Sequence, residues 1–254
     1  MNSQKLEELS DVLLNSIKPS DYFIKLDSDH IIEKMYPEVA ALKGVKQNPD
    51  FHKEGDAWVH TLMVLDAAAN RKERVSNPLY FMMSALCHDL GKAVSTSEID
   101  GAIHSFKHEL EGIRISKSFL NSLGADTQMI RYVTNMVEKH MEPNIMARAK
   151  SKIKKTNRMF YNSVAPYDLI QLSVCDCIGK LPFEGDNEAF LLKRLDIYNE
   201  IIQRPYVTAE DLLAVGIKTD ENFDKILEYA HKLRLAGVKK DNALLQALSF
   251  AKKM

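Results

Sequence analysis

Three features of the sequence predict an all-α protein. Apolar residues recur at the three- and four-residue spacing of an amphipathic helix in one segment after another, whereas strict two-residue alternation is scarce. Ten glycines and eight prolines separate these segments. The chain has 254 residues, 45% of them hydrophobic, which is enough to build a core. Helices are therefore expected over residues 6–17, 58–70, 78–86, 105–123, 126–140, 166–178, 187–203 and 222–235.

The expected helices differ in how much of their surface is apolar. The 6–17 helix is acidic and amphipathic, and the 58–70 helix has one apolar face made by Leu62, Val64, Leu65 and Ala68. The 78–86 helix instead leads into the apolar run 81–87, as expected of a buried helix.

Capping residues mark the last helices of the chain. Thr208 with Asp211 three residues later makes a capping box for a further short helix, which Gly216 would close. Gly237 follows the last turn of the 222–235 helix in the same way.

One boundary divides the expected helices. Pro205 interrupts the helical pattern between Gln203 and Thr208. We therefore expect a helical core over residues 1–204 and a small C-terminal helical module over residues 205–254.

Charge and cysteine content indicate a cytoplasmic protein that does not insert into a membrane. Lys+Arg 34 against Asp+Glu 35 gives a formal net charge of -1, so no global charge attracts nucleic acid or an anionic membrane. The N-terminus lacks a basic segment followed by an apolar one, and no apolar run reaches the length of a membrane span. The odd number of cysteines, Cys87, Cys175 and Cys177, fits buried thiols in a reducing compartment.

His88 and Asp89 are two metal-competent side chains at the end of an apolar helix. They follow the apolar run 81–87 and precede Leu90-Gly91-Lys92. Adjacent residues of a regular helix point about 100° apart, so both can reach one ion only from a groove between them, which a helix end near Gly91 would allow. The alternative for a bare His-Asp pair is a solvated turn.

His60 and Asp176 are candidates for the same site. His60 lies in the first turns of the 58–70 helix, and Asp176 interrupts the apolar stretch 172–178. A carboxylate is costly to bury unless it is paired, hydrogen-bonded or bound to a metal. The alternatives are a hydrogen-bonded core histidine and a structural salt bridge.

The order His60, His88-Asp89, Asp176 resembles the H…HD…D signature of the HD phosphohydrolase superfamily. The resemblance implies a helical HD-domain core in which these four side chains hold a divalent metal ion.

The resemblance extends to a second metal position. His108 and His140 match the two histidines by which binuclear HD proteins hold a second metal ion. His104 precedes His108 by one helical turn and is an alternative for the same position.

The resemblance also implies hydrolysis of phosphate esters. Histidines with two carboxylates suit one or two ions of Mn, Ni, Co, Fe, Zn or Mg. Two ions about 3.5 to 4 Å apart would share and activate a water molecule that attacks phosphorus, with Asp89 or Asp176 bridging them. Lys92, our candidate for a phosphate contact, is assigned with Asp89 to catalysis; the alternative for Lys92 is capping of helix carbonyls.

Replacement of Asp89 is expected to abolish catalysis and to leave the fold intact. Asp89→Ala should abolish hydrolysis because it removes an anionic ligand. The metal-free fold should be at least as stable as before, because the repulsion between Asp89 and Asp176 is relieved.

Two longer stretches of the sequence narrow the resemblance to one group of HD proteins. Residues 37–66 look like the region that opens the HD part of bacterial tRNA nucleotidyltransferases, the CCA-adding enzymes, and residues 204–217 look like their C-terminal helical module. The likeness implies a phosphorylated nucleotide or RNA-end substrate, including 2′,3′-cyclic phosphates, and tRNA as a candidate partner. Asp27-Ser28-Asp29 mimics the paired aspartates of their nucleotidyltransferase domain, but no Gly-Gly turn or strand pattern precedes it, so we interpret it as a helix-capping loop and expect no polymerase activity.

The segment 148–158 has six basic residues and no acidic one. One interpretation is a solvated, mobile loop. The other is a positive patch over the metal site that attracts a phosphate or an RNA backbone. We assign Lys152, Lys154 and Lys155, together with Lys92, to substrate binding.

A second hypothesis belongs to a different functional class. The chain could be a noncatalytic RNA-binding or protein-interaction module that keeps the fold of a tRNA enzyme. Loss of metal ligands would favour it. All six candidate ligands are present, so the hydrolase hypothesis is preferred.

Overall fold

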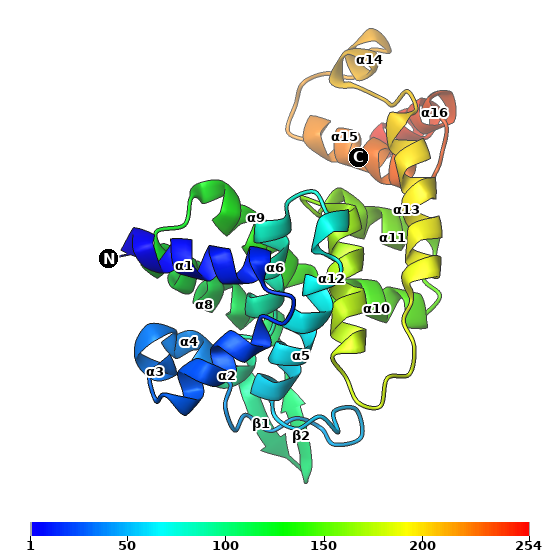
Figure 1. Cartoon of the computed structure of the whole chain (residues 1–254). Coiled ribbons are helices and arrows are strands. Elements are labelled where there is room, and N and C mark those ends of the chain that lie inside the picture. The colour runs from blue at the N-terminus through cyan, green and yellow to red at the C-terminus, as the bar shows by residue number, and fades with distance from the viewer. Residues whose placement is uncertain (1, 254) are drawn as a thin grey trace. The chain divides into compact units, whose positions relative to one another are not determined.

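The computed structural model describes residues 2–253, and these are mainly helical (Figure 1). The prediction of an all-α fold is confirmed, with the addition of one two-stranded antiparallel sheet. No helix in residues 2–253 is long and apolar enough to cross a membrane.

Contacts within the chain divide it into two compact units. The first runs up to Ile145 and resumes over Ser163–Glu188; the second comprises Met146–Asn162 and Ala189–Met254. The expected division into 1–204 and 205–254 concerns separately folding domains, and it stays a prediction.

The first unit contains the helices that surround the candidate site. In chain order its elements are α1 (Asn2–Asn15), α2 (Ser20–Ser28), α3 (Ile32–Met35), α4 (Pro37–Ala40), α5 (Ala57–Ala69), the 3-10 helix η1 (Lys72–Arg74), α6 (Pro78–Cys87), α7 (Lys92–Ser95), β1 (Thr96–Ile99), β2 (Ala102–Ser105), α8 (His108–Leu123), α9 (Thr127–Lys139) and α12 (Pro166–Ile178). Helix α10 (Met141–Arg148) begins in this unit.

Helix α6 lies in the middle of this unit. Asn77 caps its first turn by accepting a hydrogen bond from the Tyr80 amide, and Pro78 occupies the first helical position, where no amide donor is needed. Every residue from Phe81 to Cys87 is buried, because α6 packs against α1, α5, α9 and α12. The apolar run in the sequence therefore corresponds to a helix covered on several sides.

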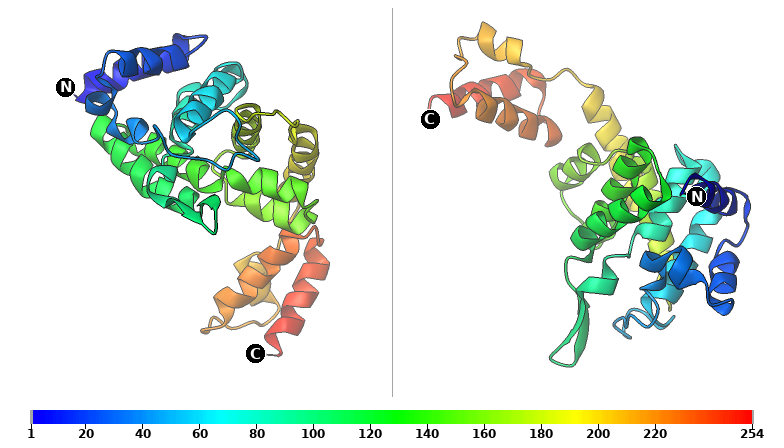
Figure 2. Two further views of the ribbon diagram at one scale, coloured as in Figure 1. Left: turned by 90° about the horizontal axis from the view of Figure 1, so that it is seen from below. Right: turned by 90° about the vertical axis from the view of Figure 1, so that its left-hand side faces the viewer.

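The hairpin β1–β2 lies before the helix that was predicted over residues 105–123 and shares only Ser105 with it. Asp100 and Gly101 form its turn with φ angles of 52° and 76°. Positive φ at both positions is the geometry of the Asp-Gly hairpin turn. The prediction missed this local signal, and α8 begins only at His108. Figure 2 shows the hairpin projecting from the helices of the first unit.

The second unit has its own small core. It contains α11 (Ile153–Tyr161), most of α13 (Glu188–Gln203), α14 (Ala209–Ala214), α15 (Phe223–Leu235) and α16 (Lys240–Ala251). Helices α15 and α16 pack together, and α15 also contacts α11. The predicted capping box at Thr208 and Asp211 is confirmed. Gly216 and Gly237 follow α14 and α15 with positive φ, as expected for glycines beyond helix ends.

Candidate metal centre

The His88-Asp89 pair lies in the turn between α6 and α7. Helix α6 ends at Cys87, and His88 is its C-cap. Both side chains are buried, and His88 Nε2 lies 3.2 Å from Asp89 Oδ2. The two adjacent side chains therefore face one space, which excludes the solvated turn.

Gly91 determines how closely this turn approaches α8. A Cβ atom at Gly91 would lie 1.9 Å from the His108 carbonyl oxygen and 2.6 Å from the Gly112 amide nitrogen. Only glycine fits such a contact between backbones. The first turn of α8, with His108, consequently lies against the His88-Asp89 turn.

His60 and Asp176 complete a first set of donors around one oxygen of Asp89. They come from α5 and α12, which pack against each other. His60 Nε2 lies 3.1 Å from Asp176 Oδ1, 3.4 Å from His88 Nε2 and 3.6 Å from Asp89 Oδ2. All three distances are short enough for these donors to share one ion.

His108 and His140 form a second set around the other oxygen of Asp89. Their Nε2 atoms are 3.3 Å apart and lie 3.3 Å and 3.7 Å from Asp89 Oδ1. His104, the alternative to His108, is on β2 with its ring stacked on Phe106 at 4.7 Å between centroids. The structure therefore brings His108, not His104, beside Asp89.

Backbone carbonyls hold the outer nitrogen of each histidine. Three Nδ1 atoms lie 2.7 to 2.8 Å from the carbonyl oxygen three residues earlier, in the pairs His88–Ala85, His108–Ser105 and His140–Val137. His60 Nδ1 lies 3.1 Å from the Gly179 carbonyl oxygen. These contacts favour protons on Nδ1 and leave the Nε2 lone pairs facing the centre, the tautomer that ligates metals.

The donor spacing fits metal coordination. Bonds of about 2.0 to 2.2 Å place neighbouring tetrahedral or octahedral ligands roughly 3.0 to 3.6 Å apart. The first set spans 3.1 to 3.6 Å and the second 3.3 to 3.7 Å. Converging Nε2 lone pairs would repel one another without a cation between them. The residues therefore fit one divalent ion in each set, with Asp89 shared.

The charges of the buried groups suit metal binding. Burial opposes ionisation of Asp89, but His88 and Lys92 hold its pKa well below the ordinary value of 3.8. Burial likewise opposes ionisation of Asp176, and Lys180 and His60 lower its pKa. Burial and the nearby His108 lower the pKa of His140 to about 3. The two carboxylates are thus anionic and His140 is neutral near pH 7, as ligands must be. Burial opposes protonation of His60 and His108, but hydrogen bonds with Asp176 and Asp89 raise their pKa values above 6.5, so metal binding would compete with protons at these two rings.

A cavity of about 340 Å³ opens beside the centre, and its wall includes Asp89, His108 and Asp176. Two lysines share this wall. Lys92 Nζ lies 2.6 Å from Asp89 Oδ2 and donates to Gln47, and Lys180 Nζ donates to Asp176 Oδ2 at 3.0 Å. Lys92 therefore contacts a carboxylate of the site, which favours the site interpretation over the capping of helix carbonyls.

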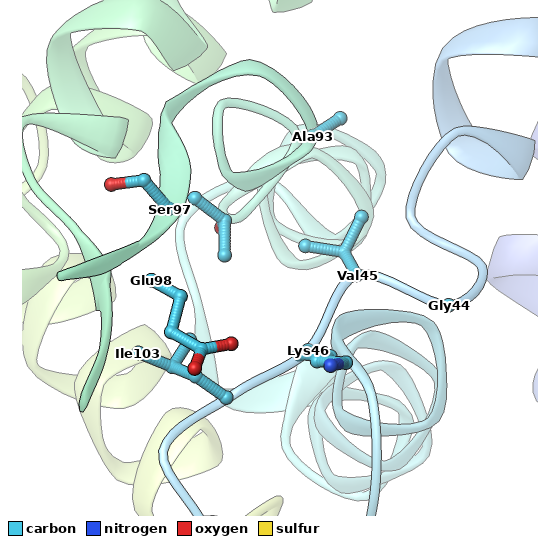
Figure 3. A pocket seen from close by; sticks show the side chains of 8 residues that line it. Gly44, Val45, Lys46, Ala93, Ser97, Glu98 and Ile103 are labelled. Atoms are coloured by element: carbon cyan, nitrogen blue, oxygen red, sulfur yellow. The ribbon is translucent and has the colours of Figure 1, made fainter. Parts of the chain in front are cut away.

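A separate cavity of about 290 Å³ lies between the 44–46 loop and the hairpin (Figure 3). Lys46 and Glu98 are the charged side chains of its wall, and none of the six candidate ligands lines it. Ile103 borders both cavities, so β2 forms part of each wall. Asp89, His108 and Asp176 line the first cavity, and no candidate ligand lines the second.

The HD domain family matches residues 58–198, more than half of the chain. The chain belongs to the HD domain family. This match contains all six candidate ligands, and it confirms the family resemblance in the sequence.

Curated relatives of this HD domain protein carry the name Multifunctional CCA protein. The protein of Actinobacillus pleuropneumoniae serotype 5b (strain L20) is 29% identical over 171 residues, which cover 66% of this chain and 41% of the relative. That of Polaromonas naphthalenivorans (strain CJ2) is 26% identical over 235 residues, covering 91% and 53%. That of Laribacter hongkongensis (strain HLHK9) is 41% identical over 93 residues, covering 37% and 22%. The chain spans about half the length of the curated relatives it matches, or less.

The sequence interpretation assigned no role to three residues that lie beside the candidate ligands, His52, Glu54 and Lys180. Glu54 Oε1 lies 3.1 Å from His60 Nδ1 and 2.6 Å from His52 Nδ1. Lys180 contacts Asp176 from one turn further along the chain. The i, i+4 spacing of Asp176 and Lys180 was the available signal. Glu54 precedes α5 in a loop, where spacing carries no such information.

The basic segment 148–158 is not a loop as a whole. Helix α11 begins at Ile153, so Lys154 and Lys155 are helical and Lys152 is the N-cap residue. All three lysines are exposed. They belong to the second unit, and their assignment to substrate binding stays a prediction.

Proposed function

We propose that this HD domain protein is a metal-dependent phosphohydrolase. Its substrates would be phosphomonoesters or phosphodiesters of nucleotides or RNA ends, 2′,3′-cyclic phosphates among them. The observation that carries the proposal is the position of Asp89, whose two oxygens face two separate sets of imidazole nitrogens. The substrate class rests on the likeness to CCA-adding enzymes.

Each candidate ligand has a role in this proposal. His60, His88 and Asp176 would hold one ion and His108 and His140 a second, with Asp89 as the bridge. The ions would be one or two of Mn, Ni, Co, Fe, Zn or Mg, and when bound they would supply an activated water molecule and offset charge on the phosphoryl oxygens.

The lysines of the cavity would hold the substrate. Lys92 and Lys180 bring two positive charges to the wall beside the candidate ligands. An anionic phosphate entering the cavity would be attracted by both and oriented toward Asp89.

The test compares the purified wild type with Asp89→Ala and Glu98→Gln. Metal content is measured first, followed by turnover of a phosphatase and phosphodiesterase panel with added Mn²⁺, Ni²⁺, Co²⁺ or Mg²⁺. Asp89→Ala should lose bound metal and at least about 100-fold in turnover. Glu98→Gln removes a carboxylate from the separate cavity and should match the wild type.

The alternative function makes a different prediction in the same experiment. A noncatalytic module would bind no metal, hydrolyse nothing in the panel, and bind tRNA equally well with or without Asp89. That set of results would replace the hydrolase proposal.

A further inference from the structure

The two units carry opposite net charges, which nearly cancel in the total for the chain. The second unit has 17 lysines and arginines against 9 aspartates and glutamates, a net charge of +8. The first has 17 against 26, a net charge of -9, and together they give the -1 of the whole chain. The second unit therefore has the charge of a polyanion-binding surface.

Helix α11 carries an exposed stripe that ends at an aromatic ring. Lys154, Arg158 and Tyr161 are all exposed and stand at positions i, i+4 and i+7, so they share one face of the helix. The stripe extends for about 10 Å along the axis. The segment 148–158 contains no acidic residue that would offset its charge.

A cavity of about 350 Å³ lies at the Tyr161 end of this stripe. Tyr206, His231 and Arg234 line it together with Tyr161, and no aspartate or glutamate is among its lining residues. Its size is at the lower end of the range of about 300 to 1,000 Å³ that is usual for small-ligand sites. The cavity and all its lining residues belong to the second unit.

The planar groups of the cavity form two pairs. The Arg234 guanidinium carbon lies 4.0 Å from the centroid of the Tyr206 ring. The rings of Tyr161 and His231 have centroids 4.3 Å apart. Tyr161 and Tyr206 are about half exposed, at 49% and 47%, so both rings present surface to a ligand. Such planar groups favour a flat, aromatic ligand.

Two buried nitrogens in this wall lack partners. Arg234 Nε and His231 Nε2 have no hydrogen-bond partner within residues 2–253. Burial, followed by the charge of Arg234, lowers the pKa of His231, so its ring is neutral near pH 7. Unmet hydrogen-bonding groups are costly to bury, so the polar edge of a heterocycle that reached these nitrogens would offset that cost.

We propose that this cavity binds a base of single-stranded RNA, with the adjoining phosphates lying along the Lys154–Arg158–Tyr161 stripe. Base stacking on tyrosine and phosphate contacts from basic side chains are the two elements of single-strand recognition. An acidic peptide could use the stripe but would leave the flat faces and the unpartnered nitrogens unused. Single-stranded RNA would use the basic stripe, the flat faces and the unpartnered nitrogens together.

The test measures binding of a fluorescein-labelled single-stranded oligoribonucleotide to the full chain by anisotropy at several salt concentrations. Tyr161→Ala and Tyr206→Ala should each weaken binding by about 5- to 150-fold, the range measured for a stacked base, without changing the salt dependence. Lys154→Gln with Arg158→Gln should weaken binding and lower the salt slope by about 1.4, since each phosphate contact of a single strand contributes roughly 0.7.

Two controls match these variants. Leu245→Ala removes a large exposed side chain from the same unit, and Lys252→Gln with Lys253→Gln removes two exposed charges from it. Both controls should bind RNA as the wild type does. Turnover of p-nitrophenyl phosphate by Tyr161→Ala should also be unchanged, so a failed metal centre and a failed RNA site give different results.

Three outcomes would overturn the inference. The first is RNA affinity that is unaffected by both tyrosine variants. The second is AMP binding as tight as that of the oligonucleotide, because the stripe would then contribute nothing. The third is preference for an acidic peptide over RNA of equal charge.

Discussion

Asp89 is surrounded by groups that need its negative charge. Lys92 is buried and lies 2.6 Å from Asp89 Oδ2, and four histidine nitrogens lie within 3.7 Å of its two oxygens. From the sequence we expected the loss of Asp89 to leave the metal-free fold at least as stable, because only repulsion by Asp176 was considered. The contact with Lys92 reverses this expectation.

Asp89→Ala should therefore destabilise the metal-free protein by about 3 kcal/mol, because it leaves the Lys92 charge buried without its carboxylate. Urea unfolding in EDTA measures this. Because the folded-state pKa of Asp89 is depressed, its contribution is present above the ordinary value of 3.8 and is lost as the pH falls further, so the difference from wild type should shrink in acid.

A double variant checks the cause. Asp89→Ala combined with Lys92→Met removes both charges and should recover part of the lost stability. If the double variant is less stable than Asp89→Ala alone, the ion pair is not what stabilises the metal-free centre.

Glu54 orients His60 from outside the two donor sets. Its Oε1 atom lies 3.1 Å from His60 Nδ1, on the side of the ring away from Asp176. Carboxylates in this position hold a ligand ring and raise its basicity. Glu54→Gln should weaken metal binding by about 10- to 100-fold in competition with a chromophoric chelator. Glu98→Gln serves as the control, and equal affinities for the two variants would exclude the role of Glu54.

At the scale of elements, the site depends on the close approach of α8 to the turn after α6. The Gly91 position meets backbone atoms of His108 and Gly112, whereas a Cβ at Gly112 would meet the Val137 side chain at 2.8 Å. A side chain can rotate away, but backbone cannot move without displacing the helix.

Gly91→Ala should consequently cost more stability than Gly112→Ala, which we expect to cost about 1 to 3 kcal/mol as an overpacking change. Because α8 carries His108, Gly91→Ala should also lower the number of bound ions. Denaturant unfolding and metal analysis of both variants test this. Equal effects of the two substitutions would show that the turn tolerates displacement.

At the scale of the whole molecule, the two units differ in the sign of their net charge, -9 for the first and +8 for the second. The candidate ligands lie in the acidic unit, and the exposed lysines of α11 and its N-cap lie in the basic one. Under the proposed function, an extended RNA substrate would also interact with the exposed lysines of the second unit. A small phosphoester would contact only the cavity at Asp89.

Replacing Lys152, Lys154 and Lys155 together by Gln should thus raise KM for an RNA substrate and leave kcat nearly unchanged. The salt slope of kcat/KM should fall by about 2, and KM for p-nitrophenyl phosphate should not change. The variant with Lys252 and Lys253 replaced by Gln is the charge control. An equal loss in kcat would reject the assignment of these lysines to substrate binding.

The helical class and the six candidate ligands could be recognised from sequence because their signals are local or keep a fixed order. Periodicity marked α5, α6 and α12, and His60, His88-Asp89 and Asp176 stand in the order of a known signature. The hairpin was missed although its Asp100-Gly101 signal is local, because its two strands are only four residues long and show little two-residue alternation.

Only the tertiary structure decided how these residues combine. Three features depend on which backbones can approach each other: the proximity of His108 rather than His104 to Asp89, the position of Asp89 between two donor sets, and the contacts of Glu54 and Lys92. The grouping of α11 with α13–α16 likewise revealed a charge division that the total of -1 conceals. Sequence spacing specifies which residues share a helix face, but distances between helices arise from packing of segments that are remote in the chain.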